Sequence, residues 1–245
     1  MDLGIKAVWY DLPLEGREEY LTWLHNTYLP AVRCLSGRIW AAHYEITGGG
    51  AALFDDRTDR MARADASEVG GGKDFLLLIG AGSPHAFFKP TRDESAIEED
   101  PITRKMKGRW IGARPCVFAE EARINGPEYD QKVPSGVPGP AIQMGSFRTK
   151  TIEDEFDLAA WYAQYRFPAM ARMPGCIATR KLLTVAGWSK HAVMYEFTSL
   201  EARREHFHHH ESLGLDDKVW TSKIIKYTVH APGSPSIGRR VWPSD

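Results

Sequence analysis

The sequence predicts an α+β fold in which two related halves of one chain form a single pseudo-symmetric barrel. Two observations lead to this prediction: an internal repeat, and the same order of expected strands and helices in both copies. The repeat appears when residues 18–45 are aligned with residues 156–183. The aligned pairs, each 138 positions apart, are Trp23 with Trp161, Pro30 with Pro168, Ala31 with Ala169 and Gly37 with Gly175. A constant offset over such uncommon residue types predicts a duplication.

Each copy is expected to begin with a strand and a helix. Short alternating runs at 5–10 and 141–148 are typical of strands. An acidic helix start follows in both copies, and the amphipathic helix carrying the repeated Trp is expected to end near the repeated proline. Gly-containing pairs at 36–37 and 174–175 predict a turn into the second strand.

The remaining elements complete a βαββαβ order in each copy. The prediction places third strands at 74–80 and 191–197, second helices at 94–107 and 201–212, and fourth strands at 113–120 and 223–230. This order is that of the ferredoxin-like unit. Helices cover one face of such a sheet and leave the other apolar face open. Two copies are therefore expected to pair these faces as an α+β barrel.

The predicted domain organisation follows the repeat. Residues 1–124 form the first ferredoxin-like repeat, with an insertion at 47–73 that is interpreted either as a lid or as a tolerated surface insertion. The Pro- and Gly-rich stretch 125–140 is the expected linker. Residues 141–231 form the second repeat, and 232–245 are expected to be an extended tail.

Composition excludes several classes of protein. The formal net charge is -1, with 31 Lys and Arg against 32 Asp and Glu, which argues against a nucleic-acid partner. Three widely spaced cysteines predict a reducing compartment and no disulfide framework. Neither a leader peptide nor a bilayer-spanning run is recognisable. We expect a cytoplasmic protein without membrane contact, and a homo-oligomer is possible.

The motif W-L-x3-Y-L-P-A-x5-G of the first copy and W-Y-x3-R-F-P-A-x3-M-P-G of the second resemble EthD-like members of the dimeric α+β barrel superfamily. The resemblance covers about 200 residues of both halves and implies the barrel fold. Its members include muconolactone isomerases, cofactor-free monooxygenases, and haem-dependent chlorite dismutases and peroxidases, so the fold implies no single activity. The histidine that the family carries in its first helix corresponds to His25, whose counterpart in the second copy is Ala163.

Several strong motifs are missing. The sequence has no G-x-S-x-G elbow, no P-loop and no HExxH. The run 208–210 is all histidine, and His206 lies one helical turn before His210, a spacing that suits either a metal site or contact with the helix dipole. We predict neither a metal nor a cofactor. Haem stays an alternative, with His191 or a histidine among 206–210 as its axial ligand.

The two copies differ at three positions that suggest a binding site. Tyr10, Tyr28 and Ala42 of the first copy align with Arg148, Arg166 and Arg180 of the second. A guanidinium binds a carboxylate bidentately, so three convergent arginines would hold a carboxylate substrate. The alternative is that each arginine pairs with a nearby surface acid.

The candidate catalytic side chains come from the same strands and from the first helix. A strand histidine can act as a general base, and a tyrosine or lysine can then polarise or protonate an enolate oxygen. The predicted catalytic residues are His43, His191, Tyr10, Lys6 and His25, and the predicted substrate-binding residues are Arg148, Arg166, Arg180, Tyr28, Tyr195 and Trp161. Each histidine has the alternative of a core residue bonded to backbone, and Trp161 that of helix packing. One active site is expected around the second copy, closed by residues of the first.

The leading functional hypothesis is a cofactor-free catabolic enzyme. It would isomerise or hydrolyse a small unsaturated carboxylate, such as a product of aromatic ring cleavage, through an enol intermediate. The first alternative is a haem-dependent or EthD-like oxidative enzyme. The second is a non-catalytic protein that binds a small molecule.

Overall fold

Eight antiparallel strands close into a barrel in the computed structural model of the chain, which describes residues 1–49, 61–132, 136–207 and 219–244. The order around the barrel is β10-β2-β4-β1-β5-β7-β8-β6, and β6 pairs back to β10. These strands are β1 (Gly4–Asp11), β2 (Arg38–Gly49), β4 (Phe75–Ala81), β5 (Ile111–Asn125), β6 (Ala141–Arg148), β7 (Cys176–Ala186), β8 (His191–Phe197) and β10 (Ser236–Trp242). The predicted α+β barrel is confirmed.

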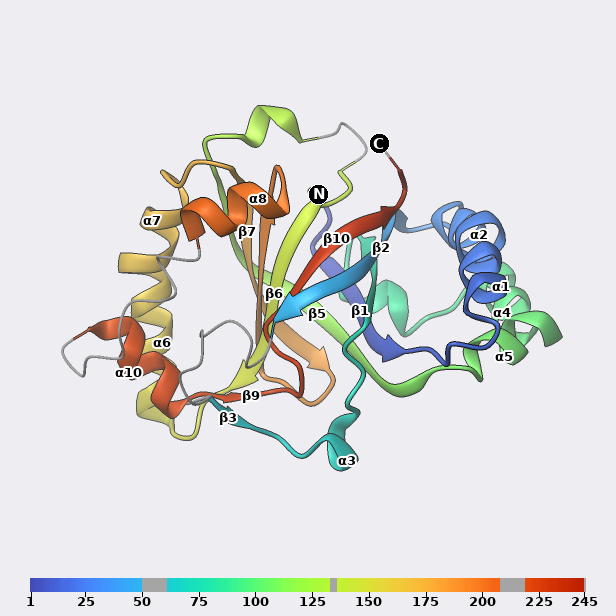
Figure 1. The fold of residues 1–245 in the computed structure, drawn as a ribbon, viewed down its shortest axis with the longest axis horizontal. Helices are drawn as coiled ribbons and strands as arrows, with labels where there is room; N and C mark the ends of the chain where they lie inside the picture. Colours follow the sequence, from blue (N-terminus) through green and yellow to red (C-terminus); the bar gives the residue numbers. More distant parts are fainter. Residues whose placement is uncertain (50–60, 133–135, 208–218, 245) are drawn as a thin grey trace.

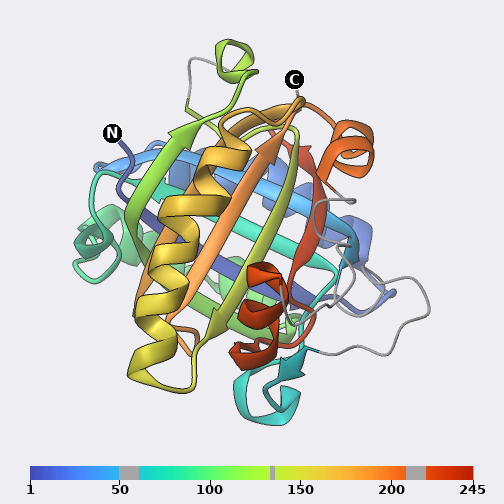
Figure 2. The same cartoon turned by 90° about the vertical axis from the view of Figure 1, so that its left-hand side faces the viewer.

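Helices cover two opposite sides of this barrel (Figure 1). On one side lie α1 (Arg17–Trp23), the π-helical turn η1 (Leu24–Tyr28), α2 (Leu29–Arg33), α4 (Arg92–Glu99) and α5 (Pro101–Lys107). On the other lie α6 (Ile152–Trp161), the π-helical turn η5 (Tyr162–Arg166), α7 (Phe167–Met170), α8 (Leu200–Ala202), η6 (Arg203–Phe207) and α10 (Trp220–Tyr227). We call the packed space between helices and sheet on these two sides the first layer and the second layer. Figure 2 shows α6 lying across the strands of the second layer.

Short elements occupy the connections. Strands β3 (Ala62–Arg63) and β9 (Val229–His230) form a parallel pair beside β6, and α3 (Ala66–Val69), η3 (Pro84–Phe87) and η4 (Tyr129–Gln131) are single turns. Strand β3 and α3 belong to the insertion predicted at 47–73, and residues 50–60 of that insertion lie outside the described residues, so its interpretation as a lid stays a prediction.

Side chains alternate between the barrel interior and the two layers, as the period of a strand requires. On β1, Ile5, Ala7 and Trp9 point into the interior, where Phe118 and Met194 of other strands meet them. The residues between them on β1, Val8 and Tyr10, belong instead to the core of the first layer. The molecule therefore has three separate cores. Alternate residues along a strand point to opposite faces of the sheet, and the face decides which core a side chain joins.

The two halves share their strand order and their π-helical turns. Strands β2-β4-β1-β5 of the first half follow the same order as β7-β8-β6-β10 of the second. The first helices were expected to end near Pro30 and Pro168, and they end shortly after these prolines, at Arg33 and Met170. In each copy a π-helical turn precedes the proline, which then stands in the first turn of a new α segment, where its missing N–H costs nothing.

The fourth strand of the second half is not at 223–230, which corrects the sequence prediction. Most of that stretch is helix α10, because Thr221, Ile224 and Ile225 repeat at helical spacing and are buried. Strand β10 comes instead from the expected tail and completes the barrel between β2 and β6. The helix expected at 94–107 is present as α4 and α5. The one expected at 201–212 is described as α8 and η6, up to residue 207.

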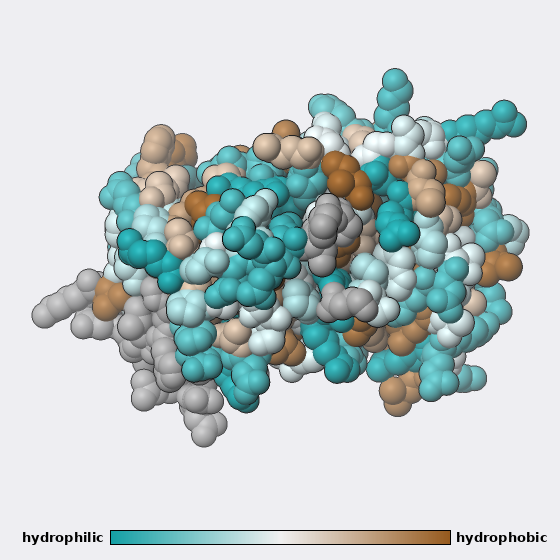
Figure 3. Space-filling view, turned by 90° about the horizontal axis from the view of Figure 1, so that it is seen from above, coloured by the Kyte–Doolittle hydropathy of each residue, from teal (hydrophilic) through white to brown (hydrophobic). Residues whose placement is uncertain are grey.

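The surface is mixed. On the face seen in Figure 3, apolar side chains are scattered among polar ones. Helix α6 exposes Ile152 and Phe156, one turn apart. Within the described ranges, no helix has the length and apolar character needed to cross a bilayer. The expected homo-oligomer stays a prediction.

Candidate functional site

Three of the predicted catalytic residues lie together in the first layer. The Tyr10 hydroxyl is 2.8 Å from Nε2 of His43, and Nδ1 of His43 is 2.8 Å from Nε2 of His25. Tyr10 and His43 are fully buried on the same face of the sheet, on β1 and β2, whereas His25 of the π-helical turn η1 is half-buried. The three side chains therefore connect the molecular surface to the core of the layer.

This hydrogen-bonded chain continues inward through two residues that the sequence did not single out. The Tyr20 hydroxyl donates to that of Tyr10 over 3.2 Å, and Nε1 of Trp110 donates to Tyr20 over 2.6 Å. A usable signal existed for Tyr20, which stands one helical turn before Trp23 on the same apolar helix face. No such signal marks Trp110, because it lies in the connection between α5 and β5, 90 residues from Tyr20 in sequence.

Burial sets the protonation of this chain. It lowers the pKa of His43 well below its ordinary value, and the neighbouring His25 adds to this effect. Burial also lowers the pKa of His25 and raises that of Tyr10. All three groups are accordingly held in their neutral forms near neutral pH.

Lys6 and Tyr28 lie in the same layer but take part in a different group. The Tyr28 hydroxyl donates to Glu98 over 2.7 Å and accepts from Lys107 over 2.8 Å, while Lys107 also pairs with Glu98. Burial alone would raise the pKa of Glu98, but Lys107 and the Tyr28 hydroxyl lower it, and Lys6 is close enough to add a smaller lowering effect. Tyr28 and Lys6 thus belong to an acid–base cluster under α4 and α5.

The second layer contains a partly enclosed cavity of about 60 Å³. Three of the predicted substrate-binding residues, Arg166, Tyr195 and Trp161, line it. Arg166 is 2 % exposed, and its guanidinium carbon lies 4.6 Å from the centre of the Trp161 ring and 5.7 Å from that of Tyr195. A guanidinium between aromatic faces is held by cation–π attraction.

The remaining walls of the cavity explain why space exists there. Gly145 on β6 contributes no side chain, and a Cβ atom at that position would have Val193 as its nearest neighbour at 3.6 Å. Phe147 closes the next outward-facing position of the same strand, and its ring centre lies 5.3 Å from that of His230, another wall residue, at an angle of 37°. The sequence analysis missed His230, since it stood at the end of a wrongly predicted strand.

The π-helical turns place functional side chains in both layers. π-Helical turns are rare in proteins, and those that occur are often found at functional sites. The first, Leu24–Tyr28, carries His25 and Tyr28, and the second, Tyr162–Arg166, carries Arg166 at the position equivalent to Tyr28. The widened turn thus directs a polar side chain under the helix in each copy.

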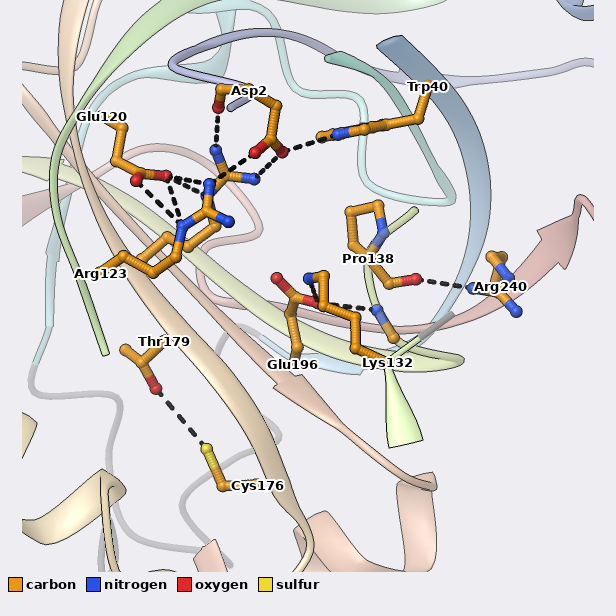
Figure 4. Close-up of polar contacts among 12 residues, drawn as sticks. Asp2, Trp40, Glu120, Arg123, Lys132, Pro138, Cys176, Thr179, Glu196 and Arg240 are labelled. Carbon is orange, nitrogen blue, oxygen red and sulfur yellow. Dashed lines mark hydrogen bonds and ion pairs between the residues drawn. The ribbon is translucent and has the colours of Figure 1, made fainter. Parts of the chain in front are cut away.

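Arg180 does not line the cavity, because on β7 it shares its face with Leu182, which belongs to the interior core. It is fully buried and joins a charged group that includes Asp2, Glu120 and Arg123 (Figure 4). Its guanidinium bonds to both the carboxylate and the backbone carbonyl of Asp2 and to Glu120. Arg123 joins the same two acids. Burial alone would raise the pKa of Asp2, but Arg180 and Arg123 outweigh it and lower that pKa to about 2. Arg180 is therefore part of an ion network that closes the barrel.

Arg148 is also away from the cavity. It is exposed at the end of β6, its guanidinium carbon is 4.2 Å from the centre of the Trp188 ring, and it donates to the Trp188 carbonyl. It borders an open cleft that Lys150, Lys190 and Glu155 also line. The expectation that the three arginines converge is wrong, since each lies in a different region.

His191 forms a pair with Glu155. Its Nε2 atom is 2.8 Å from the carboxylate, which also accepts from Lys190 over 2.8 Å. His191 is 4 % exposed, and burial followed by the nearby Lys181 lowers its pKa.

The composite site expected from the sequence does not form. Tyr10, His43 and His25 belong to the first layer, Arg166 and Tyr195 line the cavity of the second, and the barrel with its interior core lies between them. Strand parity is the reason: Tyr10 and His43 face outward in the first half and Tyr195 faces outward in the second, and these two outer faces lie on opposite sides of the barrel (Figure 1).

The described residues do not fit a haem in this cavity. Its volume of about 60 Å³ is smaller than the roughly 150 Å³ of a cavity that binds benzene. Nε2 of His191, one predicted axial ligand, is hydrogen-bonded to Glu155. Within the described ranges, no cluster of three or more His, Cys, Asp or Glu side chains could hold a metal ion. Residues 208–210 lie outside those ranges.

The sequence matches no protein-family model and no curated protein. Solved structures do resemble it. An anthrone oxidase-like protein superposes with a TM-score of 0.58 at 12% identity, covering 98% of this chain and 91% of its own. A candidate monooxygenase from Fusobacterium nucleatum gives 0.56 at 8% identity over 98% and 93% of the two chains. A variant chlorite dismutase from Candidatus Nitrospira defluvii gives 0.53 at 12% identity over 99% and 92%. At these identities the likeness shows the fold alone.

Proposed function

We propose that the protein is an oxidative enzyme that acts, without a bound cofactor, on a small carboxylate in the second-layer cavity. One observation carries the proposal: Arg166, buried between aromatic rings, stands in the wall of a partly enclosed and mainly apolar space. Such a space with a few polar groups is the usual form of a small-molecule site. A guanidinium there suits a carboxylate or an enolate oxygen.

Oxidation is favoured over the isomerisation or hydrolysis expected from the sequence. The similar structures are described as an oxidase-like protein, a candidate monooxygenase and a chlorite dismutase. The cavity volume of about 60 Å³ is also well below the roughly 150 Å³ of a cavity that binds benzene, so it suits a substrate smaller than a six-carbon ring-cleavage product. A carboxylate of two to four carbons is the size that we propose.

The proposed reaction needs only dioxygen as co-reactant. An activated methylene of the substrate loses a proton to His230 on the cavity wall, and Arg166 stabilises the enolate oxygen that forms. Dioxygen then adds to the carbanionic carbon as a hydroperoxide. Loss of water leaves a carbonyl in place of the methylene. Both oxygen atoms are accounted for, one in the product and one in water, and all the electrons come from the substrate.

The test measures oxygen uptake with short keto and unsaturated carboxylates, together with product mass. We expect uptake by the wild type, a product heavier by one oxygen and lighter by two hydrogens, and loss of uptake in Arg166→Met. The matched control is Arg148→Met, an exposed arginine of the same half. A product of unchanged mass would favour an isomerase, and binding without any product would favour a binding protein. Either result would refute the oxidative proposal.

A Soret band in the purified protein would also refute it, in favour of the haem-dependent alternative. This measurement is independent of substrate choice, so it is the first to make.

We further propose that the barrel arose by duplication of a ferredoxin-like unit. Two features support it: the shared strand order of the halves, and the π-helical turns at 24–28 and 162–166, which lie at the same 138-residue offset as the repeated Trp. The direct test is to express the first half alone, ending near residue 124, and to ask whether two copies of it assemble into a dimeric barrel. Failure of both isolated halves to form such a sheet would contradict it.

A further inference from the structure

The hydrogen-bonded chain of the first layer has a fixed direction, and Trp110 sets it. An indole N–H can only donate, so the Tyr20 oxygen must accept from Trp110. The Tyr20 proton is then directed at the Tyr10 oxygen, 3.2 Å away. Because Tyr10 is fully buried and its oxygen already accepts, its own proton needs a different acceptor.

Nε2 of His43, at 2.8 Å, is that acceptor. The reverse arrangement, with His43 donating to Tyr10, would leave the buried Tyr10 proton without an acceptor. The cost of an unsatisfied buried hydroxyl corresponds to a population ratio of about tenfold or more against this arrangement. His43 is neutral, so its single proton must be on Nδ1 and point at Nε2 of His25, 2.8 Å away.

His25 is therefore the outward end of the chain, and its proton is on Nδ1. Its Nε2 atom accepts from His43, which leaves Nδ1 as the only place for the proton of a neutral imidazole. His25 is half-buried, and its Nδ1 atom is not among the buried polar atoms, so the N–H faces the surface. No carboxylate bonds to either imidazole among the residues that the structure describes, so nothing there reverses the direction.

We propose that the outward Nδ1–H of His25 is a hydrogen-bond donor site for a ligand with a phenolate or enolate oxygen, separate from the second-layer cavity. The donor is neutral and no proton is transferred: burial lowers the pKa of His25 and His43 and raises that of Tyr10, so each group keeps its own proton. The bonds from Trp110 to His43 all point the same way, so each one polarises the next and strengthens the donor at His25. The inference does not depend on the proposed function of the cavity.

The first test is ¹⁵N NMR of the full chain with labelled histidine, which distinguishes the two tautomers of each ring. Signals are assigned by their loss in His25→Gln and His43→Gln. Near neutral pH we expect both His25 and His43 to carry the proton on Nδ1, with at least about a tenfold excess over the other tautomer. A proton on Nε2 of either residue would overturn the inference.

A conservative variant separates direction from mere packing. In Trp110→Phe the ring remains but the obligate donor is lost, so Tyr20 can accept from Tyr10 and the chain can reverse. We expect both tautomers of His43 to become populated while the fold is retained. If His43 keeps a single Nδ1–H tautomer in this variant, Trp110 does not set the direction.

The second test uses 4-nitrophenol, whose phenolate absorbs visible light and whose phenol does not. At a pH where the free probe is about half phenolate, binding to the wild type should raise the visible absorbance, because the His25 N–H stabilises the phenolate form. His25→Leu should give a smaller rise. The matched control His85→Leu, at an exposed histidine of the same half, should give the same rise as the wild type. No rise with the wild type, or an equal rise with His25→Leu, would refute the donor site.

The two proposals fail independently. Arg166→Met should leave the tautomers and the rise in probe absorbance unchanged, since Arg166 lies in the opposite layer. Loss of that rise in Arg166→Met would place the probe in the cavity and overturn the separate site.

Discussion

The first and second layers are built on the same strand order, yet they use their polar side chains differently. In the first layer, Trp110, Tyr20, Tyr10, His43 and His25 hydrogen-bond to one another in a continuous chain. In the second, aromatic side chains and Arg166 surround a cavity. Equivalent backbone positions thus support either a closed network or an open space.

One pair of positions shows how the difference arises. Tyr28 and Arg166 end the π-helical turns of the two copies. Tyr28 hydrogen-bonds to the Glu98–Lys107 pair under α4 and α5. Arg166 instead lies over the Trp161 ring, in the cavity that Gly145, which has no side chain, also lines. In the first layer, α4 and α5 supply charged partners that fill the space beside the π-helical turn. In the second layer, the missing side chain at Gly145 leaves that space open.

The largest effect is expected outside both layers, from Arg180→Met. Removing the guanidinium leaves the buried Asp2 and Glu120 with one arginine partner, Arg123, instead of two, which should lower the free energy of unfolding by about 3–5 kcal/mol. Urea unfolding measures the change. Carboxylate affinity of the folded variant should be unchanged. A large loss of affinity at unaltered stability would show that Arg180 binds substrate, as the sequence suggested.

Tyr10→Phe tests whether the first layer depends on its network. The substitution keeps the ring but leaves His43 and Tyr20 with unsatisfied hydrogen bonds in the core, so we expect a loss of about 1–3 kcal/mol in urea unfolding. Tyr129→Phe, at an exposed tyrosine, is the control and should be nearly neutral. Equal stability of the two variants would contradict a continuous network.

The same layer should make stability depend on pH. The pKa of His43 is lowered on folding, so the unfolded chain binds the proton more strongly, and stability falls as the pH drops below the ordinary value of 6.5. His25 and His191 act in the same direction. In His43→Gln, the decline of unfolding free energy between about pH 7 and pH 5 should be shallower. A decline as steep as that of the wild type would mean that His43 is not held neutral.

The smallest change in stability is expected from Gly145→Ala, which tests the second layer. The added methyl meets Val193 at an ordinary contact distance, and the strand backbone accepts alanine, so stability should rise by about 0.4–1 kcal/mol. The cavity should shrink, and carboxylate affinity should fall in titration calorimetry. Unchanged affinity would place the ligand elsewhere.

The sequence predicted much of the fold because periodicity and repeats are local signals. Strand β8 was predicted at its observed bounds, 191–197, and the alternating runs at 5–10 and 141–148 are β1 and β6. The exchange of the fourth strand for α10 was not predictable in this way. Strand β10 pairs with β2 and β6 across the whole chain, and only the need to close the barrel selects it.

For the candidate site, the residue types were easier to predict than their grouping. Tyr10, His43 and His25 were all named as catalytic candidates and are in contact. They were assigned to one site with the arginines because alignment reveals which positions differ but not which side of the barrel they face. Trp110, which orients the chain, comes from a connection that no repeat marks.

The most direct test of two separate layers is a titration of the wild type, Arg166→Met and His43→Gln with the same short carboxylate. The account predicts that Arg166→Met loses binding by at least about tenfold while His43→Gln binds as the wild type does. Comparable losses in both variants would mean that the two layers share one site, and would contradict the account.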